Sequence, residues 1–370
     1  MKRLLVGAIV ASVLTLTSCD KKEDAIEIGF AGPITGFNAV FGAQMKRGAE
    51  QAVADINAAG GVLGKKLVMR MSDDVCDPKQ AVAVANQMAA AKIPFVLGHF
   101  CSGSSIPASD VYAEANVIAM SPGSTNPKLT DDPKKKTIFR ICGRDDAQGR
   151  VAGAWLAKKY AGKRIAIAHD RQAYSQGIAD ETKKAMNAAG LQEVLYDTVT
   201  PGEKDYSAFV SKLKAARIDL LYYGGYQIES SLIARQMREQ GLEAAFMAGD
   251  GLGTMEFWTA AGAGGEGTLF TFGPDLAADP RNAEIVKRFT ANGGNPPEGY
   301  TLYSYAGIQA WAQAVQKAGT TDPTTVAAML RSNKADTVFG PVTFDAKGDV
   351  IGEPYVMYRW SKGAYAPLVE

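Results

Sequence analysis

The fold is decided by the stretch Phe95-Val96-Leu97-Gly98-His99-Phe100-Cys101-Ser102-Gly103-Ser104-Ser105, where an apolar run breaks into glycine and hydroxyl residues. This pattern predicts a strand followed by a helix that begins near Ser104 with its first backbone amides unbonded. A second run, Ser121-Pro122-Gly123-Ser124-Thr125, follows the strand expected over residues 117–120. In open α/β sheets, ligands lie beyond the carboxyl ends of strands, where helix amides favour an anion. Neither loop contains lysine or arginine, so we expect a single carboxylate rather than a phosphate chain.

Strand and helix patterns alternate on both sides of this stretch. In the first half we expect strands over residues 25–30 and 66–71, with apolar residues at helical spacing after each. The alternation restarts beyond residue 141 with these expected elements: helices over 148–160 and 174–189, and strands over 164–168, 194–197, 219–223 and 245–248. Such alternation predicts two parallel sheets with right-handed crossovers. No loose linker separates the halves, so we expect several crossings and a hinge over a cleft.

The N-terminus has the organisation of an export signal. Lys2 and Arg3 precede an apolar run that is too short for the roughly 20 residues that span a bilayer. We therefore expect residues 1–18 to be a signal peptide and the mature protein to be periplasmic. The run Leu16-Thr17-Ser18-Cys19 resembles a bacterial lipobox, which makes Cys19 the expected lipidation site and residues 19–24 a tether.

Asp20, directly after this cysteine, is associated with retention at the outer face of the inner membrane. A plain cleaved signal with an incidental cysteine is the alternative. The composition is ordinary, with 46% hydrophobic and 21% charged residues among 370. The formal net charge is +1, and it becomes −1 without Lys2 and Arg3, so nucleic acid is not an expected partner.

Motifs for catalysis are missing from the sequence. The only histidines, His99 and His169, lie in no short cluster with cysteine or glutamate, so we expect neither a metal nor a cofactor. Nucleophile-elbow, phosphate-loop and dinucleotide-binding glycine motifs are absent. The acidic pairs Asp73-Asp74 and Asp145-Asp146 are typical of solvated surface rather than of an acid–base pair. These observations predict a binding protein and not an enzyme.

Three cysteines remain beyond Cys19, an odd number for an oxidising compartment. Cys76 and Cys101 each lie just past the end of strands that we expect to be neighbours, which favours a disulfide between them. Cys142 is then a buried thiol. The alternative interpretation is a hydrolase whose nucleophile is Cys101, assisted by His99, or Ser102.

Five runs together carry a family resemblance: Ala49-Glu50-Gln51-Ala52-Val53-Ala54-Asp55-Ile56-Asn57, Cys76-Asp77-Pro78-Lys79-Gln80-Ala81-Val82-Ala83-Val84-Ala85-Asn86, Pro107-Ala108-Ser109-Asp110, Gly202-Glu203-Lys204-Asp205 and Tyr222-Tyr223-Gly224-Gly225-Tyr226. They resemble the branched-chain amino-acid binding proteins, the Leu/Ile/Val receptors of ABC importers, over residues 26–360. The resemblance implies a type I periplasmic-binding-protein fold, with two Rossmann-like lobes, parallel central sheets and a three-strand hinge. It also implies the Cys76–Cys101 disulfide.

We expect the first lobe to contain residues 25–143 and about 274–353. The second lobe is then formed by residues 144–273 and about 354–370. Position by position, the resemblance implies that Ser102, Gly123 and Thr125 hold the carboxylate and amine of an L-amino acid.

Tyr226 and Asp250 would reach the ammonium from the second lobe, and Phe41, Tyr174 and Tyr300 would form the walls of the side-chain pocket. Two positions depart from the family pattern: Asp250 replaces the common glutamate, and Gly123 replaces the usual alanine.

The implied function is that of a monomeric solute receptor that closes on an aliphatic L-amino acid and docks on an inner-membrane ABC permease. One methylene changes binding by only about 1 to 3 kcal/mol, so leucine, isoleucine and valine are all expected ligands. The alternatives are a receptor for another small amino acid or amide, and a ligand sensor domain with a separate signalling partner.

Overall fold

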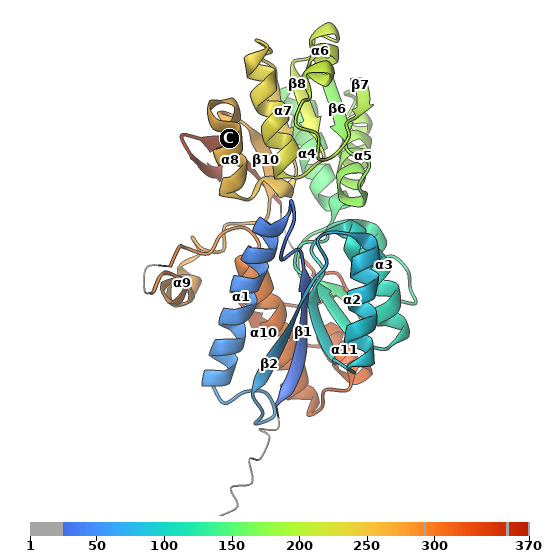
Figure 1. The fold of residues 1–370 in the computed structure, drawn as a ribbon, viewed down its shortest axis with the longest axis vertical. Coiled ribbons are helices and arrows are strands. Elements are labelled where there is room, and N and C mark those ends of the chain that lie inside the picture. Colours follow the sequence, from blue (N-terminus) through green and yellow to red (C-terminus); the bar gives the residue numbers. More distant parts are fainter. Residues whose placement is uncertain (1–24, 292–293, 353–354, 369–370) are drawn as a thin grey trace, which may run out of the picture.

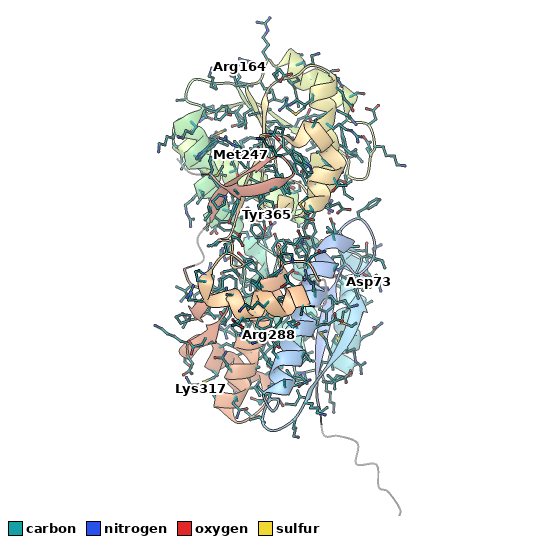
Figure 2. All side chains as sticks on the ribbon, turned by 90° about the vertical axis from the view of Figure 1, so that its left-hand side faces the viewer. Asp73, Arg164, Met247, Arg288, Lys317 and Tyr365 are labelled. Carbon is teal, nitrogen blue, oxygen red and sulfur yellow. A yellow bond between two sulfur atoms is a disulfide. The ribbon has the colours of Figure 1, made fainter. Side chains whose placement is uncertain are left out.

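The computed structural model describes residues 25–291, 294–352 and 355–368. They form two lobes, one above the other in Figure 1, and each lobe is built on its own β-sheet. Figure 2 shows Arg164 toward the far end of one lobe and Lys317 toward the far end of the other. Residues 1–24, with the expected signal peptide, the tether and Cys19, lie outside the described residues.

The first sheet has five parallel strands in the order β2-β1-β3-β4-β5. Their bounds are β1 (Ile26–Gly32), β2 (Leu67–Asp73), β3 (Phe95–Gly98), β4 (Ile118–Ser121) and β5 (Ile138–Arg140). The helices of this lobe are α1 (Ala39–Ala58), α2 (Pro78–Ala90), α3 (Ser102–Glu114), α10 (Thr301–Ala318) and α11 (Pro323–Ser332), with the short helix η1 (Pro127–Leu129) and the β11 (Ala335–Thr337) and β12 (Gly340–Val342) hairpin.

The second sheet has seven strands in the order β14-β13-β10-β9-β8-β6-β7. Their bounds are β6 (Ile165–His169), β7 (Glu193–Thr198), β8 (Leu220–Tyr223), β9 (Ala245–Ala248), β10 (Leu269–Phe272), β13 (Val356–Ser361) and β14 (Ala364–Pro367). The helices of this lobe are α4 (Asp145–Lys159), α5 (Ala173–Ala188), α6 (Ser207–Ala215), α7 (Gln227–Glu239), η2 (Asp250–Leu252), α8 (Met255–Ala261) and η3 (Gly262–Gly265). Between β10 and α10 the chain also forms η4 (Pro280–Asn282) and α9 (Ala283–Thr290).

Strand β3 is buried on both faces, because its successive side chains point alternately to the two sides of the sheet. Phe95 and Leu97 belong to the large apolar core, and Phe95 stacks on Trp311 of α10 with ring centroids 4.8 Å apart. Val96 points to the opposite face, into the cluster formed with α2 and α3. Both faces of a parallel sheet are normally covered in this way. The sequence prediction of two parallel α/β units is confirmed.

The chain passes between the sheets three times: after β5, after β10 and before β13. The last passage adds β13 and β14 as an antiparallel edge, because β13 pairs antiparallel with β10. The sequence pattern did not indicate this edge. The exact lobe boundaries stay a prediction.

The Cys76–Cys101 disulfide is present, with Cα atoms 5.6 Å apart. The pairing predicted from the sequence is confirmed, and the idea of a Cys101 thiol nucleophile is wrong. The expectation that the strands before the two cysteines are neighbours is also wrong, because β1 lies between β2 and β3. Cys142 is buried, and its sulfur lies 3.7 Å from the carbonyl oxygen of Ser124.

The expectation that both acidic pairs are solvated is wrong for one member of each. Asp74 and Asp145 are both 0% exposed. Asp74 pairs with Nδ1 of His99, and Nε2 of His99 lies 3.1 Å from the hydroxyl of Tyr112. His99 is therefore a structural histidine of the first lobe.

Candidate ligand-binding site

The strand orders bring the expected site residues to facing sheet edges. In the first sheet the order changes direction between β1 and β3, and in the second between β6 and β8. Crevices for ligands form beyond the carboxyl ends of strands at such points. Ser102 follows β3, Tyr226 follows β8 and Asp250 follows β9, so the topology places these residues at the boundary between the lobes.

The loop after β4 is held by the hydroxyl of Ser121. This hydroxyl donates to the carbonyl oxygen of His99 over 2.6 Å. It accepts hydrogen bonds from the amides of Gly123 and Ser124, at 3.3 and 2.8 Å. The loop that carries Gly123 and Thr125 is thus tied to the end of β3, as the sequence pattern predicts.

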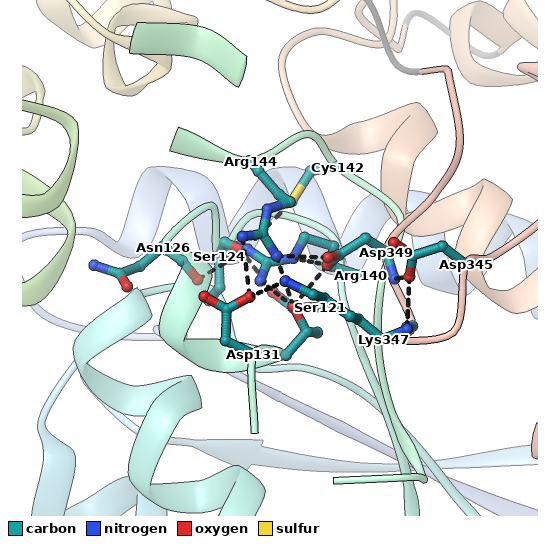
Figure 3. A network of polar contacts seen from close by, with 12 residues as sticks. Ser121, Ser124, Asn126, Asp131, Arg140, Cys142, Arg144, Asp345, Lys347 and Asp349 are labelled. Atoms are coloured by element: carbon teal, nitrogen blue, oxygen red, sulfur yellow. Dashed lines mark hydrogen bonds and ion pairs between the residues drawn. The ribbon is translucent and has the colours of Figure 1, made fainter. Parts of the chain in front are cut away.

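Arg140 fixes the same loop from behind, as Figure 3 shows. Its Nη1 donates to the carbonyl oxygens of Ser124 and Asn126, at 2.9 and 3.0 Å, on either side of Thr125. Its Nε pairs with Asp349 at 2.6 Å. Burial by itself would raise the pKa of Asp349, but its ion pairs hold that pKa below the ordinary value. This buried network gives Thr125 a rigid backbone.

The hydroxyl of Ser104 is buried without a partner among the described residues, and the hydroxyl of Thr125 is buried beside the Asp145 carboxyl group. Ser102 is 1% exposed, and its hydroxyl accepts a 3.3 Å hydrogen bond from the amide of Asn126. Helix α3 begins at Ser102, two residues before the expected start, because the amides of Ser104 and Ser105 already donate to the carbonyl of Cys101. Buried hydroxyls without protein partners are suited to receive a polar ligand.

Gly123 has a steric reason to lack a side chain. A Cβ atom at this position would lie 2.4 Å from the ring of Phe100. No real Cβ contact is that short, so alanine would require the ring to move. The departure from the family's usual alanine therefore belongs together with Phe100, which the resemblance did not single out although it lies in the stretch that decides the fold.

Asp250 is the centre of the polar contacts from the second lobe. It is 3% exposed, and its carboxylate accepts hydrogen bonds from the hydroxyls of Tyr174 (2.8 Å) and Tyr300 (2.6 Å). Tyr174 also accepts a bond from the amide of Gly251. Burial raises the pKa of Asp250, and the two hydroxyl donors partly counteract this. Because Tyr300 immediately precedes α10 of the first lobe, the carboxylate joins the two lobes.

Aromatic rings surround this carboxylate. Phe41 stacks on Phe100 with centroids 4.6 Å apart and meets the edge of Tyr300 at 5.9 Å. Tyr174 and Tyr226 lie 4.8 Å apart. Four of the residues predicted to bind the ligand thus form one cluster: Phe41, Tyr174, Tyr226 and Tyr300. Their rings contact one another directly, so a ligand enters only when the lobes separate.

Further hydrogen bonds between the lobes describe a closed arrangement. The side chain of Gln227, from the second lobe, donates to the carbonyl oxygen of Phe37 of the first at 3.1 Å. Gln227 also donates to Glu256 of its own lobe at 2.9 Å. The side chain of Asn126 donates to the carbonyl oxygen of Ala173 at 2.7 Å. The bonds to Phe37 and Ala173 cross between the lobes and must break when the lobes open, so closure is stabilised by polar as well as aromatic contacts.

Asp145 is a residue of this region that the sequence reasoning missed. It is the first residue of α4, and its amide donates to the carbonyl of Thr125 over 2.9 Å. Its side chain is buried, and the hydroxyl of Thr125 lies close enough to the carboxyl group to lower its pKa, against the larger effect of burial, which raises it. Because Asp145 stands in an acidic pair, the sequence predicted that its side chain faces solvent. Only the tertiary fold shows that the side chain turns inward.

The described residues contain no group of three or more histidine, cysteine, aspartate or glutamate side chains arranged to hold a metal ion. Within the same part of the chain, no helix has the length and apolar character needed to cross a bilayer.

Two α/β lobes with polar and aromatic strand ends facing each other define a bilobal solute-binding protein. The chain belongs to the periplasmic binding protein family, whose model matches residues 25–364. It is 48% identical over 364 residues to "Leu/Ile/Val-binding protein homolog 1" of Brucella melitensis, covering 98% of this chain and 97% of the relative.

It is 39% identical to the leucine-, isoleucine-, valine-, threonine- and alanine-binding protein of Pseudomonas aeruginosa, with 98% and 96% of the two chains covered. Among solved structures, the leucine-binding protein LivK of Thermotoga maritima is similar, with a TM-score of 0.86 and 25% identity. The match covers 93% of this chain and 98% of the other. The family resemblance read from the sequence is confirmed.

Proposed function

We propose that this protein is the extracytoplasmic substrate-binding component of an ABC importer for branched-chain L-amino acids. The names of its full-length relatives support leucine, isoleucine and valine as ligands. The single structural observation that carries the proposal is the Asp250 carboxylate, which is buried among tyrosines and lies at the boundary with the first lobe. A buried carboxylate of this kind requires a cation, and an α-ammonium group supplies one.

The remaining predicted site residues suit the other parts of such a ligand. Hydroxyls and amides around Ser102, Gly123 and Thr125 would hold the carboxylate without a basic side chain, because helix and loop amides carry partial positive charge. The rings of Phe41 and Tyr300 would contact the aliphatic side chain. The ligand then takes the place of ring contacts that now hold the lobes together.

Binding can be tested by calorimetric titration of ligand-stripped, refolded protein against the twenty standard amino acids. Leucine, isoleucine and valine should bind, and small-angle scattering should show compaction with each of them. Preference for alanine, threonine or an amide would redirect the proposal to the alternative receptor class. Steady release of product from amino-acid amides, without saturable binding, would overturn it in favour of a hydrolase.

We also propose that the mature chain is a monomer, anchored by a lipid on Cys19 to the outer face of the inner membrane and delivering its ligand to an ABC permease. Family membership supports an extracytoplasmic location and a permease partner. The lipobox-like run before Cys19 supports the anchor.

A further inference from the structure

A second cavity lies between the two lobes, beside the crossing segment that follows β10. Its volume is about 270 Å³. One wall comes from α8, β10, β13 and β14 of the second lobe, and the other from residues 296–303, at the start of α10 of the first lobe. Its lining does not include Asp250, Tyr174 or Phe41 of the proposed amino-acid site. Because both walls are needed to enclose it, this separate cavity forms when the lobes close.

Four aromatic side chains line this cavity. Phe272, Tyr358 and Tyr365 belong to strands of the second sheet, and Tyr303 belongs to α10. The ring centroids of Phe272 and Tyr303, one from each lobe, are 5.9 Å apart. Those of Tyr358 and Tyr365 are 5.8 Å apart. Clustered rings of this kind attract cations, because the face of an aromatic ring carries partial negative charge.

The charged side chains that line the cavity are all acidic. They are Asp275 and Glu298, and the lining contains no lysine, arginine or histidine. Asp275 accepts hydrogen bonds from the amides of Ala277 and Ala278, at 3.0 and 3.3 Å. Burial raises the pKa of Tyr365, and the charges of Glu298 and Asp275 raise it further, so both carboxylates lie near this ring.

Arg47 compensates the charge of Glu298 only in part. Burial raises the pKa of Glu298, and Gln44 and Arg47 counteract this. The guanidinium of Arg47 donates to the carbonyl oxygens of Phe289 and Pro296, at 3.1 and 3.0 Å. Among the described residues neither carboxylate of the cavity forms an ion pair, so the cavity keeps a negative charge.

We propose that this cavity binds a small alkylammonium cation and that the bound cation stabilises the closed arrangement of the lobes. The carboxylates supply the opposite charge, the rings contact the cation, and Leu276 and Leu302 suit its apolar part. An occupant contacts walls from both lobes, so it binds the closed state more tightly than the open one. The cavity also adjoins the proposed amino-acid site, because the Phe272 ring contacts the rings of both Tyr303 and Tyr300.

Choline and its uncharged isostere 3,3-dimethyl-1-butanol test the charge requirement, by NMR titration of wild type at pH 7 without amino acid. Choline should bind at least about tenfold more tightly than the alcohol. Asp275→Asn should weaken choline binding by about threefold to fivefold, the range for an exposed charge pair. Asp279→Asn is the matched control, because Asp279 does not line the cavity and pairs with Arg281, and its choline affinity should equal that of wild type. Equal binding of choline and the alcohol, or equal effects of the two substitutions, would overturn the proposal.

Tyr365→Phe and Tyr365→Leu test the contribution of the rings. Tyr365→Phe keeps the ring and should keep the choline affinity of wild type. Tyr365→Leu removes the ring and should weaken choline binding by about threefold to thirtyfold. Equal choline affinity of the two variants would overturn the proposal. Thermal unfolding checks that both variants fold, and if Tyr365→Leu does not, the comparison of Asp275→Asn with Asp279→Asn decides.

Binding of choline does not depend on the proposed function, whereas its coupling to leucine rests on it. Saturating choline should raise the leucine affinity about fivefold, and leucine should raise the choline affinity by the same factor. Competition between the two would place the cation in the amino-acid site and overturn the proposal, and an unchanged leucine affinity would overturn the stabilisation of the closed state. If choline binds and no amino acid does, the proposed function fails and the cavity assignment stands. If leucine binds and choline does not, the cavity assignment alone fails.

Discussion

Replacing Asp250 with asparagine should remove most of the affinity for branched-chain amino acids. The substitution keeps the shape of the side chain but removes the negative charge between Tyr174 and Tyr300. Truncating one partner of a buried charge pair costs about 3 to 5 kcal/mol, because the other charge stays buried without compensation. Each 1.4 kcal/mol is a factor of ten, so the dissociation constant for leucine should rise by roughly two to four orders of magnitude.

The assay is calorimetric titration with leucine, accompanied by small-angle scattering with and without ligand. Asp250 comes from the second lobe and contacts Tyr300 beside the first, so the variant should also show little compaction. Its fold should persist, because a buried carboxylate with a raised pKa contributes little to stability and the amide still accepts a tyrosine bond.

Glu256→Gln is the matched control, because Glu256 is another carboxylate near the lobe boundary and accepts a hydrogen bond from Gln227. Its leucine affinity should stay within threefold of wild type. An Asp250→Asn protein that binds leucine within threefold of wild type would refute the reasoning. Loss of binding in Glu256→Gln would then assign the ammonium to that side chain.

Three other outcomes follow from the structure and sequence. Gly123→Ala should lower stability by about 1 to 3 kcal/mol in denaturant unfolding, because its Cβ would overlap the Phe100 ring; an unchanged midpoint would contradict this close packing. Asp349→Asn should cost about 3 to 5 kcal/mol at neutral pH. The pKa of Asp349 is lowered in the fold, so this difference should be complete above about pH 4 and shrink as the pH falls further; a pH-independent difference would exclude the ion pair with Arg140 as its cause. Cys19→Ser should release the protein from the membrane fraction, and equal membrane association of variant and wild type would disprove the anchor.

Local sequence determined the elements and their order. The continuous apolar run at Phe95–Gly98 indicates a strand that is buried on both faces. The helical spacing around Ala49 indicates which face of a helix is buried. The positions of Cys76 and Cys101 just past the ends of two strands were enough to predict their disulfide, although β1 lies between those strands. Parallel topology then follows from the alternation of strands and helices, since each crossover helix carries the chain back to the edge of the sheet at which the previous strand began.

Only the tertiary structure decided which polar residues face inward. Asp145 stands beside Asp146 in the sequence, yet one is buried and the other pairs with Arg144 near solvent, because α4 packs one side against α5. The join between Asp250 and Tyr300 spans 50 residues, and no local pattern reports such a contact. Charge and hydrogen-bond requirements of a buried group are set by what the fold brings beside it, and that information lies outside the local sequence.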